Sequence, residues 1–194
     1  MKHLSISLAC LFFSLSLFAQ TEADSLLTTQ EISFRDSIAA INLSNENLQL
    51  VQETYNKATD FFANKEYAQA LQAYSDILDV DSTYINAFYN RAICFKELKR
   101  FEEAIADMDQ VFVLDSANVD ALLQKASYFS LNNQSQEAKK GYEEINQLFP
   151  SNAKAFYQLG VLQYLDKEYQ EAINSFTKAI KVDSKYTYAY NDRA

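Results

Sequence analysis

The sequence predicts an all-α fold built from tandem pairs of antiparallel helices, and three observations support this. The chain of 194 residues contains two glycines and one proline, far below their average shares of roughly 7% and 5%. Sheets need such residues in their tight turns, so helices joined by short polar turns are favoured. The hydrophobic share of 48% is sufficient for a core. The third observation is an internal repeat of small residues.

Small and bulky residues recur in one register along most of the chain, with a period of 34 residues. A fixed period of this length indicates stacked structural units. Small side chains let two helices approach closely, so we expect them to lie between packed helices. The two small sets are Ala58, Ala92, Ala126 and Gly160, and Ala70, Ala104, Ala138 and Ala172. Four residues after the second set come Tyr74, Met108, Tyr142 and Phe176.

Each copy of the repeat is predicted to form two helices. In the second copy, residues 86–95 carry apolar residues at helical spacing, and residues 101–114 form another amphipathic segment. Lys99 and Arg100 mark a tight turn between them, and residues 115–118 are typical of turns and helix N-caps. A single pair cannot cover its apolar faces, so each pair is expected to stack on the next.

The period and the residues that mark it resemble the tetratricopeptide repeat. The fourth copy matches best, with Tyr157, Gly160, Tyr169, Ala172 and Phe176 at the marked positions. The resemblance implies a right-handed superhelical solenoid of about four and a half repeats. The expected copies are residues 51–84, 85–118, 119–152 and 153–186, with an incomplete copy at 187–194.

The N-terminus is predicted to be an export signal peptide at residues 1–19. Lys2 and His3 precede an apolar run, and Ala19 supplies a small residue at the expected cleavage point. The run is shorter than the roughly 20 residues that span a bilayer, so cleavage is favoured over anchoring. Residues 20–50 match no copy and are predicted to form a polar linker and an N-terminal capping helix. We therefore expect a periplasmic or envelope-associated protein.

The composition argues against several classes of function. A formal net charge of -9 disfavours nucleic acids and anionic membranes. Without residues 1–19 the chain has no histidine and one cysteine, Cys94, which rules out histidine-based triads and Cys/His zinc sites. Cys94 is expected to be a buried filler, and the acidic pairs are expected on solvated faces. We expect no enzyme activity, cofactor, metal or small-molecule substrate. The acidic pairs are Glu102–Glu103, Asp107 with Asp109, and Glu143–Glu144.

The resemblance implies that the first helix of each pair lines a concave groove that binds a partner. Rigid aromatic side chains there would anchor a peptide or helix. The alternative interpretation is that tyrosines at these positions serve packing between repeats. The predicted groove residues are Tyr55, Phe62, Tyr89, Ile93, Lys96, Leu123, Lys154, Tyr157, Val161 and Tyr164.

Some members of this family hold a C-terminal carboxylate in a clamp of basic and amide residues. Of the corresponding residues here, only Asn90 fits the clamp, and Asp120 would repel a carboxylate. Binding of that kind is not expected. The corresponding residues are Tyr55, Thr59, Asn90, Asp120 and Gln124.

Together these features predict a non-catalytic protein–protein interaction scaffold, exported from the cytoplasm, that binds a protein or peptide segment in its groove. The alternative is the extracytoplasmic sensor part of a longer membrane signalling protein, which the incomplete copy at residues 187–194 suggests. Membrane contact is expected only if the signal stays uncleaved or if a C-terminal span follows.

Overall fold

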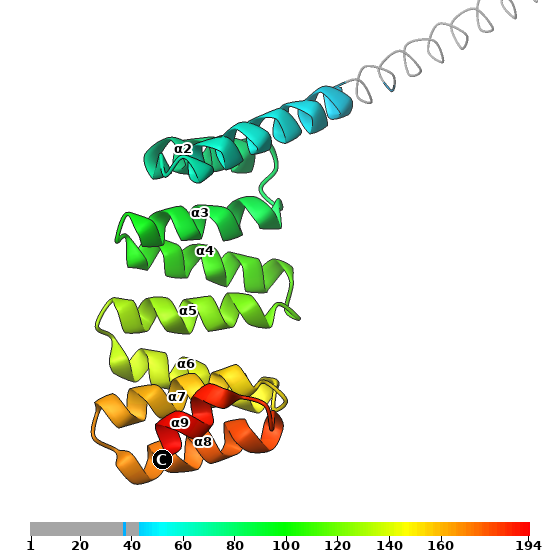
Figure 1. Cartoon of the computed structure of the whole chain (residues 1–194). Coiled ribbons are helices and arrows are strands. Elements are labelled where there is room, and N and C mark those ends of the chain that lie inside the picture. Colours follow the sequence, from blue (N-terminus) through cyan, green and yellow to red (C-terminus); the bar gives the residue numbers. More distant parts are fainter. Residues whose placement is uncertain (1–36, 38–42) are drawn as a thin grey trace, which may run out of the picture. The chain divides into compact units, whose positions relative to one another are not determined.

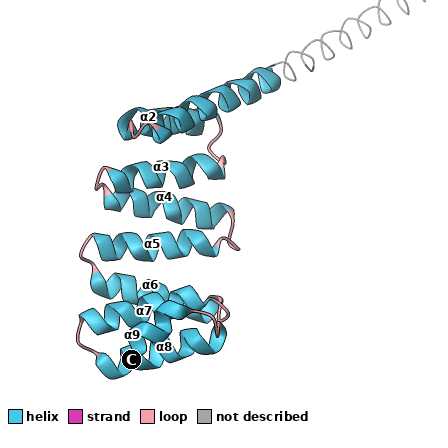
Figure 2. Cartoon of the chain, viewed as in Figure 1, coloured by secondary structure: helices cyan, strands magenta, loops and turns pink. Residues whose placement is uncertain are grey.

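The computed structural model describes residue 37 and residues 43–194, and all the regular structure in this part of the chain is helical (Figure 2). The all-α solenoid predicted from the sequence is confirmed. The predicted signal peptide at residues 1–19, and most of the linker before residue 51, lie outside the described residues. Residues 43–50 are helical and exposed, including Leu43, Leu48 and Leu50.

From residue 51 onward the helices stack in the order of the chain (Figure 1). The substantial contacts among α2–α9 all join consecutive helices, so each helix packs mainly on its neighbours in the sequence. No helix within the described residues is long and apolar enough to span a bilayer. The first helix of the stack covers residues 51–63, and the others are α2 (Tyr67–Val80), α3 (Ile85–Glu97), α4 (Phe101–Leu114), α5 (Val119–Leu131), α6 (Ser135–Leu148), α7 (Ala153–Leu165), α8 (Tyr169–Val182) and α9 (Thr187–Arg193).

The small residues of the repeat lie inside the stack, as predicted. Ala70, Ala104 and Ala138 are fully buried, and Ala172 is 1% exposed. Gly160 is also buried, and a Cβ atom on it would lie 2.7 Å from Cε1 of Phe176. The absence of larger side chains therefore lets the helices of each pair lie close together.

The turn within each pair places a non-glycine residue in the left-handed region. Lys65, Lys99, Asn133 and Lys167 have φ angles of 63°, 59°, 59° and 66°. In the second pair the amide of Arg100 donates to the carbonyl of Phe95 at 2.8 Å, and the amide of Lys99 donates to that of Lys96 at 3.0 Å. These two bonds form the Schellman motif, which satisfies the last carbonyls of α3.

Polar side chains form the turns between consecutive pairs. Asp81, Asp115 and Asp183 each accept a hydrogen bond from the amide two residues further on. Asn118 and Asn152 cap α5 and α7 by accepting from the amides of Ala121 and Ala155, at 3.1 and 3.0 Å. Because these side chains satisfy amides that the helices cannot, the chain reverses without glycine.

Candidate functional site

The ten predicted partner-binding residues lie on one side of the first helix of each pair, here called the binding face. With 3.6 residues per turn, the second, fifth, ninth and twelfth residues of a copy share one side of a helix. Lys154 is at the second place. Tyr55, Tyr89, Leu123 and Tyr157 are at the fifth, Ile93 and Val161 at the ninth, and Phe62, Lys96 and Tyr164 at the twelfth.

The tyrosine at the fifth place of the first copy connects one pair to the next. The ring of Tyr55 lies edge-on to that of Tyr74, with centroids 5.9 Å apart, and 5.7 Å from the ring of Tyr84. Its hydroxyl accepts a hydrogen bond from Nδ2 of Asn90 at 2.9 Å. Much of this side chain therefore serves packing between repeats.

The fourth copy repeats this arrangement. The ring of Tyr157 lies 5.7 Å from that of Phe176 and 5.3 Å from that of Tyr186. Its hydroxyl donates to Oδ2 of Asp192 on α9 at 2.8 Å. Burial raises the pKa of Tyr157 to about 12, and the hydrogen bond to Asp192 adds to the shift. Tyr157 thus holds α9 against the fourth pair.

Leu123 differs from its prediction as a groove residue. It is only 5% exposed and belongs to the core with Leu122 and Tyr142. The fifth place points toward the following pair, so an aliphatic side chain there becomes buried between repeats. Tyr89, at the same place, is half-buried against the cluster that contains Met108.

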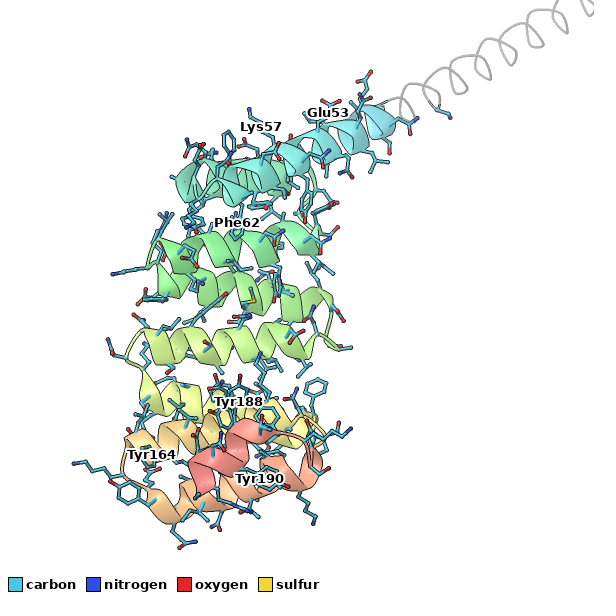
Figure 3. All side chains as sticks on the ribbon, in the orientation of Figure 1. Glu53, Lys57, Phe62, Tyr164, Tyr188 and Tyr190 are labelled. Carbon is cyan, nitrogen blue, oxygen red and sulfur yellow. The ribbon has the colours of Figure 1, made fainter. Side chains whose placement is uncertain are left out.

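The twelfth and thirteenth places carry the exposed apolar surface of the binding face. Tyr164 projects from the end of α7 and is 56% exposed (Figure 3). Its ring lies edge-on to Tyr169 at 5.5 Å. Leu131 and Leu165, at the thirteenth place, are 51% and 67% exposed. The prediction missed these two leucines, although reading the period one residue further would have found them.

The remaining predicted residues are at least partly accessible. Phe62 is half-buried, and its ring lies edge-on to that of Tyr67 at 5.6 Å. Ile93 and Val161 are half-buried, and Lys154 is exposed. Lys96 forms an ion pair with Glu97 beside it. The positive charge of this lysine is therefore offset by a neighbouring carboxylate.

Several of the groups that could do chemistry are engaged in structural contacts. Cys94 is fully buried, and burial raises the pKa of its thiol to about 11. Asp107 and Asp109 pair with Arg91 and Lys125 at 2.7 and 2.6 Å. Glu103 accepts a hydrogen bond from Arg100 at 2.8 Å, which lowers its pKa. Among the described residues, no three histidines, cysteines or carboxylates gather where they could hold a metal.

Two clefts open on the other side of the first helices, here called the cleft face. The larger has a volume of about 500 Å³ and lies among α6, α7 and α8, where Phe156, Leu159 and Gln163 of α7 line it. The smaller, about 230 Å³, lies beside Leu122 and Phe129 of α5. None of the ten predicted residues lines either cleft.

Comparison with known proteins places the chain in a family. The tetratricopeptide repeat family matches residues 55–118 and residues 153–186. The chain belongs to the tetratricopeptide repeat family. The comparison with curated proteins found no match to this chain.

Solved tetratricopeptide structures resemble the array in fold. MamA (residue 41 to its end) from Desulfovibrio magneticus RS-1 aligns with a TM-score of 0.63 and 18% identity, over 74% of this chain and 81% of that solved chain. A tetratricopeptide repeat protein from Parabacteroides merdae aligns with a TM-score of 0.65 and 19% identity, over 73% and 56%. The first tetratricopeptide domain of Spaghetti (RPAP3), bound to the HSP90 peptide SRMEEVD, aligns with a TM-score of 0.53 and 25% identity, over 60% and 93%.

Proposed function

We propose that this chain is an exported, non-catalytic scaffold that binds a segment of a partner protein along its binding face. The observation that carries the proposal is the apolar surface at the twelfth and thirteenth places. Leu131, Tyr164 and Leu165 are each more than half exposed and lie on the first helices of adjacent pairs. Exposed apolar surface of this kind is typical of protein interaction sites, and rigid aromatic rings are efficient anchors.

Membership of the tetratricopeptide repeat family supports this proposal. The RPAP3 domain that shares the fold is bound to a peptide of HSP90. A stack of helix pairs offers a long, rigid surface on which an extended or helical segment can lie. The partner we propose is therefore a protein segment with apolar side chains.

The mode of binding that we propose does not use a carboxylate clamp. Asn90, which matches the clamp pattern, donates its amide hydrogen to the hydroxyl of Tyr55 at 2.9 Å. Asp120 is exposed and would repel a terminal carboxylate. Recognition is therefore expected to depend on apolar contacts and to tolerate amidation of the partner's C-terminus.

Site-specific photocrosslinking of the full chain in its host tests the binding face. A photoreactive amino acid at residue 164 should yield a crosslinked partner that a probe at residue 148 does not. Leu148 is a suitable control because it is 54% exposed and lies on the second helix of its pair, α6. Replacing Leu131 and Leu165 by Ser should remove the crosslink, whereas Leu148→Ser should leave it. Equal crosslinking from both probes would contradict the proposal.

Export is tested separately by cell fractionation and N-terminal sequencing. The mature protein should be found outside the cytoplasm, with Gln20 as its first residue. A cytoplasmic chain that retains residues 1–19 would refute the exported part of the proposal and leave the binding face untouched.

A further inference from the structure

On the cleft face of the second helix pair, the side chain of Arg91 is held by neighbouring side chains of the same chain. Cζ of Arg91 lies 5.5 Å from the ring centroid of Phe88 and 5.7 Å from that of Phe95. Its Nε and Nη2 donate to the two carboxylate oxygens of Asp107 at 2.8 and 2.7 Å. Its Nη1 donates to Oγ of Ser75 at 3.1 Å. Aromatic rings, a carboxylate and a hydroxyl thus bind the guanidinium group.

The same place in the first and third copies also carries a cation beside an aromatic ring. Lys57 lies 5.8 Å from the ring centroid of Phe61, and Lys125 lies 6.0 Å from that of Phe129. Lys125 also donates to Asp109 at 2.6 Å. Three of the four complete copies therefore carry a cation at this place in the period.

The fourth copy keeps several of the groups around Arg91 but has no cation at the position of Arg91. Leu159 stands two periods after Arg91, and Phe156 stands two periods after Phe88. Ser175 takes the place of Asp107, and Glu143 takes the place of Ser75. These four residues line the cleft of about 500 Å³ among α6, α7 and α8. A carboxylate, a hydroxyl and an aromatic ring therefore surround a place where the chain offers no positive charge at the arginine position.

Polar groups complete the lining of this cleft. Gln163 replaces the phenylalanine found at its place in the other copies, and Ser175 donates a hydrogen bond to its Oε1 at 2.7 Å. Asn146 replaces a leucine, phenylalanine or isoleucine, and its Nδ2 and Oδ1 are buried without a hydrogen-bond partner. An unpaired buried carboxamide is costly, so a ligand that brings N–H donors to it gains a partner for the oxygen.

We infer that the cleft of the fourth pair binds an arginine side chain from a basic segment of a partner protein. The guanidinium lies where the side chain of Arg91 lies in the second pair, with its face on Phe156 and its N–H groups toward Glu143 and Ser175. A planar guanidinium fits this combination of ring and acceptors better than a compact ammonium. The formal net charge of -9 also favours a basic partner. This site lies on the cleft face, so it does not depend on the function proposed for the binding face.

Lys178 shows that the ring of Phe156 accepts a cation. Its Nζ lies 5.9 Å from the centroid of that ring, and Lys178 is one of the residues that line the cleft. Lysine on a long flexible stem can leave the ring when an arginine enters. It nevertheless competes with the ligand, so Lys178→Gln should strengthen arginine binding.

Calorimetric titration of the full chain with Nα-acetyl-arginine amide tests the site. We expect saturable binding that is weakened about tenfold by Glu143→Gln, because a charge-assisted bond is lost. Glu144→Gln is the matched control on α6, because it removes the same charge but lines the smaller cleft. Nα-acetyl-citrulline amide, which has the same shape without the charge, and Nα-acetyl-lysine amide should bind at least about tenfold more weakly.

A second variant fills the cleft from within. Leu159→Arg combined with Ser175→Asp recreates the Arg91–Asp107 pair in the fourth copy, and it should abolish binding of the arginine amide while the helical circular dichroism remains. Leu165→Ser, on the binding face, should leave arginine binding unchanged. Three results would each overturn the inference. They are equal effects of Glu143→Gln and Glu144→Gln, binding of the lysine amide as tight as that of the arginine amide, and binding of the arginine amide that survives in the filled variant.

Discussion

The second and fourth helix pairs both have small residues where their two helices meet, here called the seam: Ala92 and Ala104 in the second pair, Gly160 and Ala172 in the fourth. The two pairs differ on the cleft face. In the second pair, the side chain of Arg91 fills the space between Phe88 and Asp107. In the fourth pair, Leu159 stands in its place and a cleft of about 500 Å³ remains. The comparison shows that the seam makes the pairs stack, while a few residues away from it decide whether a pair is closed by its own side chains.

The largest difference between the two pairs should come from removing the residue at the Asp107 position. Asp107→Ala leaves the guanidinium of Arg91 without its carboxylate in a largely buried place, which should lower the free energy of unfolding by about 3 kcal/mol. Ser175→Ala, its counterpart, removes one hydrogen bond to Gln163 and should cost about 1 kcal/mol. Urea denaturation followed by circular dichroism measures both. Equal losses of stability would mean that the cleft faces of the second and fourth pairs do not differ in the way described.

Asn146, on α6 of the third pair, offers the opposite test, because replacing it should stabilise the array. Asn146→Leu removes a buried carboxamide that has no partner and adds apolar contact, so we expect a gain of about 1–2 kcal/mol. Asn174→Leu is the control, since Asn174 lines the same cleft but is exposed. The melting temperature of each variant measures the change in stability. A loss of stability in Asn146→Leu would show that its amide has a stabilising contact.

Glycine to alanine substitutions examine the seam itself. At Gly160 the new Cβ would lie 2.7 Å from the buried ring of Phe176, so overpacking should exceed the gain in helix propensity. We expect a net loss of about 1 kcal/mol in the free energy of unfolding. At Gly141 the nearest atom is Cβ of Ala126 at 3.1 Å, so Gly141→Ala should be close to neutral. Chemical denaturation distinguishes the two, and stabilisation by Gly160→Ala would disprove the close approach.

The turn inside each pair is a feature that the second and fourth pairs share, so its variants should behave alike. Lys99→Gly and Lys167→Gly each relieve a left-handed conformation and should raise stability by about 0.5–1 kcal/mol. Asn133→Gly in the third pair should gain less, because asparagine tolerates this conformation better. Thermal melts of the three variants provide the measurement. Unequal effects at Lys99 and Lys167 would show that the turns differ.

The seam could be predicted from the sequence because a fixed period repeats both its residue sizes and its environment. Ala70 and Ala104 are buried for the same reason, and one copy therefore predicts the others. The turn residues were also predictable, since Asn118 caps α5 with its own side chain. Residue type and position within the period were sufficient for these features.

The binding face and the cleft were harder to predict, because they depend on how consecutive helix pairs pack against each other. Leu123 and Tyr55 share a place in the period, but the degree to which the next pair covers that place cannot be read from helical spacing. The cleft depends on Asn146 and Gln163, which lie on different helices and both replace bulky apolar residues. Only the packed structure shows that these two polar residues line the same cleft.

The restriction of substantial contacts to consecutive helices has a mechanical consequence. A stack pulled from its ends would lose one pair at a time from whichever end is weaker, since among α2–α9 no substantial contact joins helices that are not consecutive. Each event would release 34 residues, which extend to about 115 Å. The force trace would then show evenly spaced peaks, with the peak for the second pair, closed by Arg91 and Asp107, the highest.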